Sequence, residues 1–462
     1  MTEQNQNVLN EEYDVKMILK YAGQIKDGNL QIGNYFGGGD PEVTNLRFLE
    51  KFDIQTLKIY ISSDMSVQLR SSLLKELSIF NEREYDQDEK QTQRLNMQID
   101  DLELENLEVL DLHNSVKNDQ LYNLAKFKKL HTLDVSFNNV DLTHIHIAKS
   151  LTKLTMVSCG LKNINLISSL VNLEELDISL NEDLDLSPLY KIDSLTKLSV
   201  CSCGLKNIHQ IVQLTNLEVL DISSNKLQTI DSIGQLVNLK ELDISGNKKL
   251  DINPLKNLVG LIKLDMRNCA LTQLSALQPL FNLQTLDLSY NPNIIITELK
   301  YLKKLKHLNL ASCNFVSVYV LRPLMNLEEL DISDNKILYL DAAFNQMTKL
   351  EKLIAEKNRI SDFSQLEQHP NYNIINENGC RCFEISNQED PSQAELYLAN
   401  HFRSIERPNL KLKEIQVSYR TFETALNNFK KQINSVINSY NHIQFTSSVA
   451  HLFEKLTQTI SQ

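Results

Sequence analysis

A Leu-x-x-Leu-x-Leu motif recurs along the middle of this chain at an almost constant interval. Successive motifs begin 23, 21, 22, 22, 22, 22, 22, 22, 22, 22 and 23 residues apart. Their first leucines are Leu107, Leu130, Leu151, Leu173, Leu195, Leu217, Leu239, Leu261, Leu283, Leu305, Leu327 and Leu350. So steady an interval indicates twelve structural repeats, and we number the positions of each repeat from this first leucine.

Each repeat has the pattern of a short strand followed by a turn and a return path. Positions 4 and 6, such as Leu220 and Ile222, fall on one side of the strand because side chains alternate along it. Apolar residues further along the same repeat point to the same interior, namely Leu227, Ile230, Ile233 and Leu236. One repeat cannot bury this face alone, so the repeats are expected to stack into a solenoid.

Position 9 predicts a ladder of buried side chains inside the solenoid. The chain turns inward after each strand, and its buried backbone groups then need hydrogen-bond partners. Asn offers donors and an acceptor, whereas Cys is small and a weak donor. Ser115 opens the ladder, which continues through Asn138, Cys159, Asn181, Cys203, Asn225, Asn247, Cys269, Asn291, Cys313, Asn335 and Asn358. Cys159 and Cys203 are two coils apart, as are Cys269 and Cys313, which corresponds to about 9–10 Å. A disulfide needs Cα atoms within about 7 Å, so structural thiols are expected.

These units resemble the leucine-rich repeat family in the segments LEELDISLN (173–181), LEVLDISSN (217–225) and LQTLDLSYN (283–291). The 22-residue unit is similar to that of the protein phosphatase 1 regulatory subunit made of such repeats, over residues 107–370. The resemblance implies an α/β solenoid, the leucine-rich repeat horseshoe, with a parallel β-sheet on its concave face.

The N-terminal part of the chain departs from the regular repeat. Residues 1–43 contain a helical pattern that ends near Gly28, and we expect them to form a helical cap. Residues 44–106 are expected to contain two degenerate repeats, around Leu57 and Leu77, followed by a charged insertion.

The C-terminal part of the chain contains no repeat. The solenoid is expected to occupy residues 107–379, with about twelve coils. In residues 380–462, apolar side chains recur at helical spacing and predict a helical C-terminal region. That region is either a cap or an interaction hairpin, and homo-oligomerisation through residues 415–460 is an open alternative.

Charge and hydropathy restrict the class of partner. There are 47 Lys and Arg against 59 Asp and Glu, a net charge of −12, with no basic arm, which argues against nucleic acid. No apolar run approaches the roughly 20 residues of a membrane helix, so no membrane partner is expected. The polar N-terminus lacks a signal-peptide pattern, the seven cysteines are an odd number, and no Asn-x-Ser/Thr acceptor occurs. These features predict a cytoplasmic protein.

Catalytic signatures are missing from the sequence. It contains no GxSxG, Walker lysine loop, HExxH, GxGxxG or CxxC motif. His144 and His146 alternate in what we expect to be an extended segment, but no Cys or Asp stands near them at metal-site spacing. We therefore expect no enzyme activity, no cofactor and no metal.

Position 5 points out of the sheet on the concave face and is mostly acidic. It carries Asp111, Asp134, Asp177, Asp221, Asp243, Asp265, Asp287 and Asp331. These carboxylates have two interpretations: they hydrogen-bond neighbouring strand residues, or they contact a partner. In either case, carboxylates about 5 Å apart create a negative potential that complements a partner protein with a basic surface.

Larger side chains indicate where contact energy concentrates on this face. Position 8 supplies Phe137 and Tyr290, position 7 supplies His113 and Arg267, and position 3 supplies His307. Aromatic and Arg side chains dominate the binding energy of protein interfaces. We expect Arg267, Tyr290 and His307, on three adjacent coils, to form the contact centre.

The sequence thus predicts a non-enzymatic protein–protein interaction scaffold that binds its partner on an acidic concave face. Three alternatives stay open. The first is a regulatory subunit of a protein phosphatase, and the second is a surface or secreted adhesin similar to the internalin type. The third is a structural element that self-associates through the C-terminal helices.

Overall fold

The computed structural model describes most of the repeat region. The described residues are 16–32, 46–61, 69–81, 102–115, 124–139, 142–248, 250–338, 340, 344–360 and 369. All of them belong to the first of two compact units, Met1–Asn387, and the second unit is Gln388–Gln462. The helical region predicted for residues 380–462 lies outside the described residues.

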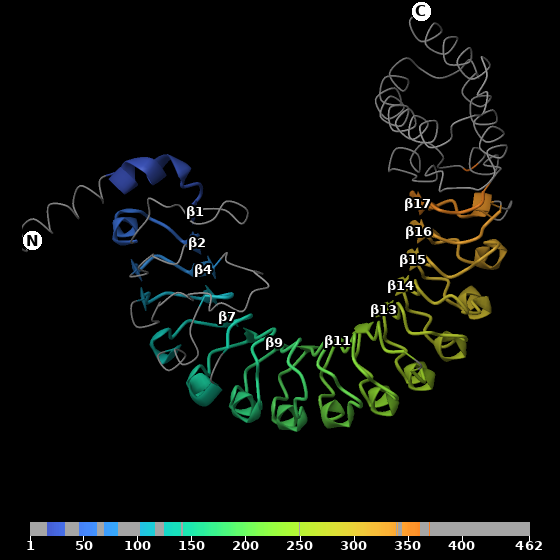
Figure 1. Cartoon of the computed structure of the whole chain (residues 1–462), viewed down its shortest axis with the longest axis horizontal. Helices are drawn as coiled ribbons and strands as arrows, with labels where there is room; N and C mark the ends of the chain where they lie inside the picture. The colour runs from blue at the N-terminus through green and yellow to red at the C-terminus, as the bar shows by residue number, and fades with distance from the viewer. Residues whose placement is uncertain are drawn as a thin grey trace, which may run out of the picture. The chain divides into compact units, whose positions relative to one another are not determined.

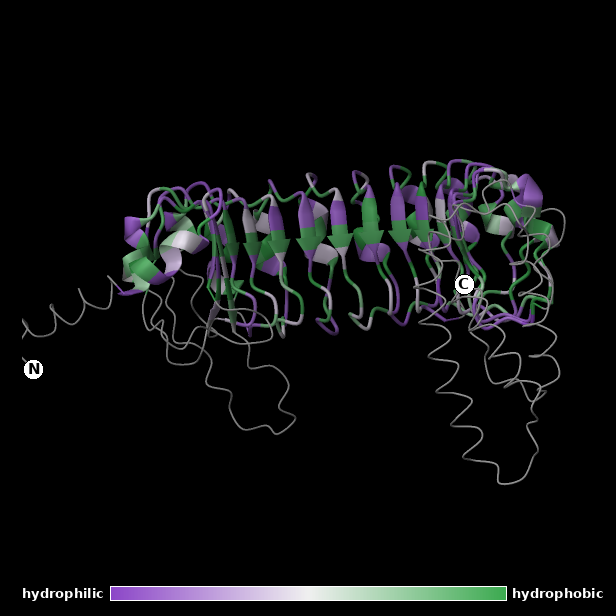
Figure 2. Ribbon diagram, turned by 90° about the horizontal axis from the view of Figure 1, so that it is seen from above, coloured by the Kyte–Doolittle hydropathy of each residue, from purple (hydrophilic) through white to green (hydrophobic). Residues whose placement is uncertain are grey.

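The described strands form one long parallel sheet and one short one. They are β1 (Asn29–Ile32), β2 (Thr56–Ile61), β3 (Leu69–Arg70), β4 (Glu76–Asn81), β5 (Leu102–Glu103), β6 (Val109–Asp111), β7 (Thr132–Asp134), β8 (Lys153–Thr155), β9 (Glu175–Asp177), β10 (Lys197–Ser199), β11 (Val219–Asp221), β12 (Glu241–Asp243), β13 (Lys263–Asp265), β14 (Thr285–Asp287), β15 (His307–Asn309), β16 (Glu329–Asp331) and β17 (Lys352–Ile354). Fifteen of them pair in chain order, while β3 pairs with β5. The long sheet lines the inner side of the curved row of coils (Figure 1), where its strands stand side by side (Figure 2). The predicted solenoid with a concave parallel sheet is confirmed.

Short 3-10 helices form the return path on the outer side of the coils (Figure 1). A coil of 22 residues leaves room for a three-residue strand and a helical turn, but not for a long helix. The 3-10 helices are η1 (Ala22–Gln24), η2 (Arg47–Lys51), η5 (Leu142–Ile147), η6 (Asn165–Ser169), η7 (Ser187–Lys191), η8 (His209–Ile211), η9 (Asp231–Gln235), η10 (Asn253–Asn257), η11 (Ser275–Leu277), η12 (Thr297–Tyr301), η13 (Tyr319–Leu321) and η14 (Phe344–Gln346).

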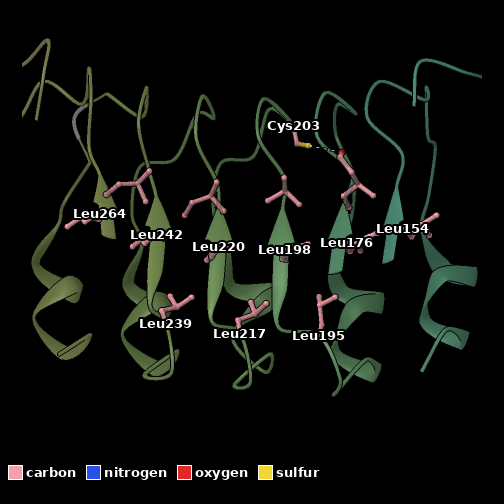
Figure 3. Close-up of a cluster of buried hydrophobic side chains, with 14 of the residues drawn as sticks. Leu154, Leu176, Leu195, Leu198, Cys203, Leu217, Leu220, Leu239, Leu242 and Leu264 are labelled. Carbon is pink, nitrogen blue, oxygen red and sulfur yellow. Dashed lines mark hydrogen bonds between the residues drawn. The ribbon is translucent and has the colours of Figure 1, made fainter. Parts of the chain in front are cut away.

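The interior is a continuous apolar column built from the same positions of every coil. In the coil that contains β11, the buried side chains are Leu217, Leu220, Ile222, Leu227, Ile230, Ile233 and Leu236. The equivalent leucines of neighbouring coils pack in rows (Figure 3). Because each coil buries its apolar face only against its neighbours, stability depends on every interface between adjacent coils.

Three additional strands extend the sheet at its N-terminal end. The two degenerate repeats supply β2 and β4, whose Leu57 and Leu77 are buried like position 4 of the regular coils. The segment expected to be a helical cap is helical over residues 16–21, but it also supplies β1, which pairs with β2. The sequence interpretation missed β1, whose Leu30 and Ile32 are buried.

The ladder at position 9 satisfies the backbone where each strand ends. The buried Asn181 donates from Nδ2 to the carbonyl oxygens of Met156, Ile178 and Ser179, at 2.8, 2.9 and 3.1 Å. Its Oδ1 accepts from the N–H groups of Cys159 and Leu161 in the preceding coil, at 2.9 and 3.2 Å. One Asn side chain therefore connects two coils through five hydrogen bonds.

A ladder cysteine makes fewer and weaker contacts than a ladder asparagine. Cys203 Sγ lies 3.4 Å from the carbonyl oxygen of Ile178 in the preceding coil (Figure 3). It also lies 3.5 Å from the carbonyl oxygen of Cys201. A thiol cannot replace the Asn Oδ1 as an acceptor for two N–H groups of the preceding coil. The coil before each of Cys203, Cys269 and Cys313 therefore needs a different turn.

That difference is visible in where the next buried apolar residue lies. In coils followed by a ladder Asn, the next buried apolar residue occupies position 11, as in Leu161, Leu205 and Leu271. In coils followed by Cys203, Cys269 or Cys313, it occupies position 12, and these residues are Leu184, Leu250 and Ile294. In the four Cys coils, position 10 also has a positive φ, at Gly160, Gly204, Ala270 and Asn314. Two types of turn therefore exist, and the ladder residue of the following coil selects between them.

Position 8 has a left-handed backbone in all twelve coils. Its φ lies between 51° and 72° at Asn114, Phe137, Ser158, Leu180, Ser202, Ser224, Gly246, Asn268, Tyr290, Ser312, Asp334 and Lys357. The N–H of this residue donates to the next coil, as Tyr290 does to the carbonyl of Ala311 at 2.9 Å. Gly and Asn suit this conformation, whereas a bulky side chain is strained in it.

Candidate functional site

The acidic row at position 5 runs along the concave face with two interruptions and one replacement. Strand register places Asp111 beside Asp134, and it places Asp221, Asp243, Asp265 and Asp287 side by side on four adjacent coils. Thr155 and Ser199 separate Asp177 from the other acids, and Asn309 separates Asp287 from Asp331. The longest run of acidic neighbours is therefore the central one.

Each of these carboxylates also has a structural task. Every position-5 Asp accepts a hydrogen bond from the backbone N–H two residues later, as Asp243 does from Ser245 at 2.8 Å. Asn309 makes the same contact with the N–H of Ala311 at 3.0 Å. The side-chain amide oxygen of Asn309 thus accepts the same backbone hydrogen bond without carrying a charge. The negative charge of the row is therefore not needed for that hydrogen bond.

The protonation of the row reflects both burial and crowding. Burial first, and then the neighbouring Asp134, raise the pKa of Asp111 to about 6, although the N–H of His113 and the charge of Lys58 act in the opposite direction. The pKa values of Asp243 and Asp287 are also raised, chiefly by burial. Burial and the neighbouring carboxylates therefore outweigh the nearby positive charges of Lys58 at Asp111 and of Arg267 at Asp287.

The charges at position 3, by contrast, largely neutralise each other across strands. Glu175 lies between Lys153 and Lys197 and pairs with both, and Glu329 pairs with Lys352 and, at 3.4 Å, with His307. Contacts with lysine lower the pKa of both glutamates. Position 5 rather than position 3 therefore sets the sign of the potential on this face.

The residues predicted as the contact centre do lie on adjacent coils, but two of them are already paired within the chain. Arg267 Nε lies 2.9 Å from Asp265 and 3.8 Å from Asp287, and these contacts raise its pKa. His307 pairs with Glu329. Tyr290 is 60% exposed and holds a left-handed backbone. Of the three residues, Tyr290 is the one that offers an uncommitted surface.

The sequence interpretation named His113 and Phe137 on this face, but it missed that they continue a row of rings from Tyr60 and Phe80 at its N-terminal end. Tyr60 stacks on Phe80 with ring centroids 5.0 Å apart, Phe80 lies 6.3 Å from His113, and His113 lies 4.7 Å from Phe137. The four rings come from four consecutive strands or coils and are all partly exposed. Their signal was an aromatic residue after the strand pattern in each degenerate repeat.

The described thiols and imidazoles are candidate metal ligands and reactive groups. The five described cysteines are free, and burial raises the pKa of Cys159 and Cys269 to about 12 and of Cys203 and Cys313 to about 11. The expectation that His144 and His146 lie in an extended segment is wrong, because both belong to η5. Within the described ranges, no three His, Cys, Asp or Glu side chains are grouped to hold a metal ion. Nor does any described helix have the length and hydropathy to cross a membrane.

The stacked coils, the parallel sheet and the Asn ladder define a solenoid protein of β-strand repeats. A family model described as two copies of the leucine-rich repeat matches residues 215–257, and a single leucine-rich repeat model matches residues 324–337. The chain is a leucine-rich repeat protein. The narrower similarity to the phosphatase 1 subunit stays a prediction.

The solved structures similar to this chain include the following two. An internalin from Listeria monocytogenes is 28% identical, and the match covers 58% of this chain and 79% of that chain with a TM-score of 0.52. A leucine-rich repeat protein of Leptospira interrogans is 21% identical, with 71% and 92% covered and a TM-score of 0.54, and it supports the fold. No curated protein matches the sequence. The repeats and the internalin likeness suggest a protein-interaction scaffold.

Proposed function

We propose that this protein is a non-enzymatic scaffold that binds a partner protein with a basic surface on its concave face. The observation that carries this proposal is the run of four carboxylates, Asp221, Asp243, Asp265 and Asp287, aligned by register on adjacent coils. Only its C-terminal half contains an internal cation, Arg267. Asp221 and Asp243 are therefore the part of the run best suited to meet positive charge from a partner.

The physical argument concerns specificity and association rate. Aligned like charges about 5 Å apart repel one another, and a basic surface relieves that repulsion when it docks. Such a field steers a basic partner to the face and weakens with salt, because the Debye length falls from about 10 Å at 0.1 M to about 3 Å at 1 M.

The test separates the charge of the row from its structural task. The variant Asp221→Asn with Asp243→Asn removes two charges and keeps the N–H acceptor, as Asn309 does naturally. The control is Asp185→Asn with Asp251→Asn, because these exposed aspartates accept the same type of backbone bond outside the strands. Proteins captured from lysate would be identified by mass spectrometry.

The proposal predicts one basic partner for the wild type and the control, and its loss from the concave-face variant. Binding of the purified partner is also expected to weaken as salt rises. Equal capture by all three proteins, or a partner whose affinity is independent of salt, contradicts the acidic row as the binding site.

We further propose a cytoplasmic location, which the free thiols of the ladder support. A second candidate is a surface or secreted adhesin, which the similarity to the Listeria internalin favours. Protease treatment of intact cells followed by fractionation distinguishes the two. Digestion of the protein on intact cells would contradict the cytoplasmic proposal. Protection of the protein from the protease until the cells are lysed would contradict the adhesin proposal.

A further inference from the structure

The row of rings at the N-terminal end faces outward from the concave side of the sheet. In β2 and β4, burial alternates: Leu57, Ile59, Leu77 and Ile79 point inward. Tyr60 and Phe80 fall on the opposite side and remain partly exposed. His113 and Phe137 continue the row in the next two coils through the ring contacts described above. The result is an unbroken aromatic surface, which we call the ring row.

Two acids lie directly beside the ring row, and the charge of Lys58 acts on one of them, Asp111. Asp111 and Asp134 are neighbours by register and stand two and three residues before His113 and Phe137. Neither has an ion pair among the described residues, whereas the equivalent Asp265 and Asp287 share Arg267. The N-terminal pair therefore lacks the guanidinium group that the same row contains further along.

The backbone at Phe137 supplies an independent argument. Its φ of 59° is a conformation in which Asn, Ser and Gly fill most other coils, and a bulky residue there is strained by about 1 kcal/mol or more. The side chain remains partly exposed and packs on His113 alone among described rings. Leu180 and Tyr290 share this conformation and are exposed, but Leu180 has no ring and Tyr290 contacts no other ring among the described residues. Phe137 therefore combines the strained position with a place in the ring row.

We propose that the ring row, with Asp111 and Asp134, binds an extended arginine-bearing segment of a partner protein. Arginine fits better than lysine, because its planar guanidinium stacks on aromatic rings and pairs with carboxylates through two parallel hydrogen bonds. This inference rests on the proposed function of the concave face in protein binding. It adds a second position on that face and the chemistry of the residue recognised there.

The dimensions of the ring row fit a short segment. Three coil intervals of about 4.8 Å span about 14 Å, and an extended chain rises about 3.3 Å per residue, so four or five residues cover the row. Side chains on one side of such a segment repeat every 6.6 Å or so, close to the 4.7–6.3 Å between the rings. Arginines at alternate positions would each meet a ring.

The test uses the full-length chain and fluorescent peptides of alternating glycine and arginine, four of each, measured by anisotropy. Matched peptides carry lysine or the neutral citrulline in place of arginine. Phe137→Asn removes a ring while giving the left-handed position an amide, as Asn114 and Asn268 do in their coils. Leu180→Asn is the control, because it also replaces a large side chain by asparagine at the same left-handed repeat position, two coils away and outside the ring row.

We expect Phe137→Asn to weaken arginine-peptide binding about 3- to 30-fold, and Leu180→Asn to leave it unchanged. Asp111→Asn with Asp134→Asn should weaken it as well and reduce its salt dependence. Lysine and citrulline peptides should bind progressively less well.

Three outcomes overturn the inference. In the first, Phe137→Asn binds like the wild type. In the second, the lysine peptide binds as tightly as the arginine peptide, which would leave charge alone as the cause. In the third, a neutral oligosaccharide such as cellohexaose displaces the peptide, which would make the ring row a sugar site. If peptide binding instead depends on Asp221 and Asp243, this inference fails while the proposed function stands.

Discussion

Replacing one ladder asparagine should cost far more stability than replacing one ladder cysteine. In Asn181→Ala, the N–H groups of Cys159 and Leu161 lose their acceptor, and the carbonyl of Met156 loses its donor. The carbonyl of Ser179 keeps a partner in the N–H of Ser158, and that of Ile178 keeps the thiol of Cys203. Three buried groups are thus left unpaired, and at about 1 kcal/mol or more each the free energy of unfolding should fall by at least about 3 kcal/mol.

Cys203→Ala provides the comparison within the same ladder. It removes two weak thiol contacts of 3.4 and 3.5 Å and one sulfur atom from the core, for an expected cost of about 1 kcal/mol. Asn172→Ala is the control for residue type, since its exposed side chain makes one bond, to the carbonyl of Lys149. It should cost about 1 kcal/mol or less.

The assay combines urea unfolding with hydrogen exchange measured by mass spectrometry. Asn181→Ala should speed exchange at the amides of Cys159 and Leu161 specifically, while peptides from the C-terminal coils keep their protection. Because coils interact only with their neighbours, the damage should stay local at low urea. Equal destabilisation by Asn181→Ala and Cys203→Ala, or unchanged exchange at those two amides, would refute the ladder argument.

Three further predictions concern thiols, protons and backbone strain. Among the described cysteines, Cys201 is the partly exposed one and should react first with a thiol reagent, as peptide mapping would show, while Cys159, whose pKa burial raises to about 12, should react only on unfolding. Asp111→Asn should raise stability at pH 8 by about 1–3 kcal/mol. The folded state holds the proton of the Asp111 carboxyl more tightly than the unfolded state, so wild-type stability falls as the pH rises from about 3.8 to about 6. If the urea midpoint of Asp111→Asn changes with pH as the wild-type midpoint does, this prediction is wrong. Leu180→Asn should stabilise the fold by about 1 kcal/mol, because Leu180 is 48% exposed and holds a left-handed conformation that asparagine adopts with less strain. A lower thermal midpoint would show that the packing of the Leu180 side chain stabilises the fold by more than its backbone strain destabilises it.

Periodicity made the regular coils predictable from the sequence. Leucines at fixed offsets determine both the strand and its inward face, and therefore Leu220, Ile222 and the other predicted interior residues of that coil are buried. The position-5 aspartates were predictable as outward-facing residues, but their two interpretations could not be separated. Only the geometry shows that each one accepts the backbone N–H two residues later.

What sequence reasoning missed depends on local geometry that spacing does not encode. Strand β1 offers only Leu30 and Ile32 as apolar signal, and Tyr60 and Phe80 stand in repeats without a ladder asparagine. The strained backbone of Phe137 results from a turn that all coils share. The residue type at position 8 varies too much from coil to coil to predict that conformation. Arg267 likewise reads as a free interface residue until its distances to two aspartates are known.

Because the coils have two types of turn, the deletion or duplication of a single coil is not equivalent to that of a pair of coils. A recombination that deletes residues 181–224 joins Leu180 to Asn225, and every coil still faces the kind of ladder residue for which its turn is shaped. A deletion half as long, of residues 181–202, brings Cys203 next to Cys159 and places a cysteine where the turn at Leu161 was shaped for an asparagine. Where Asn and Cys alternate in the ladder, this solenoid should therefore lengthen and shorten most readily by pairs of coils, whereas a single coil can be lost between Asn225 and Asn247.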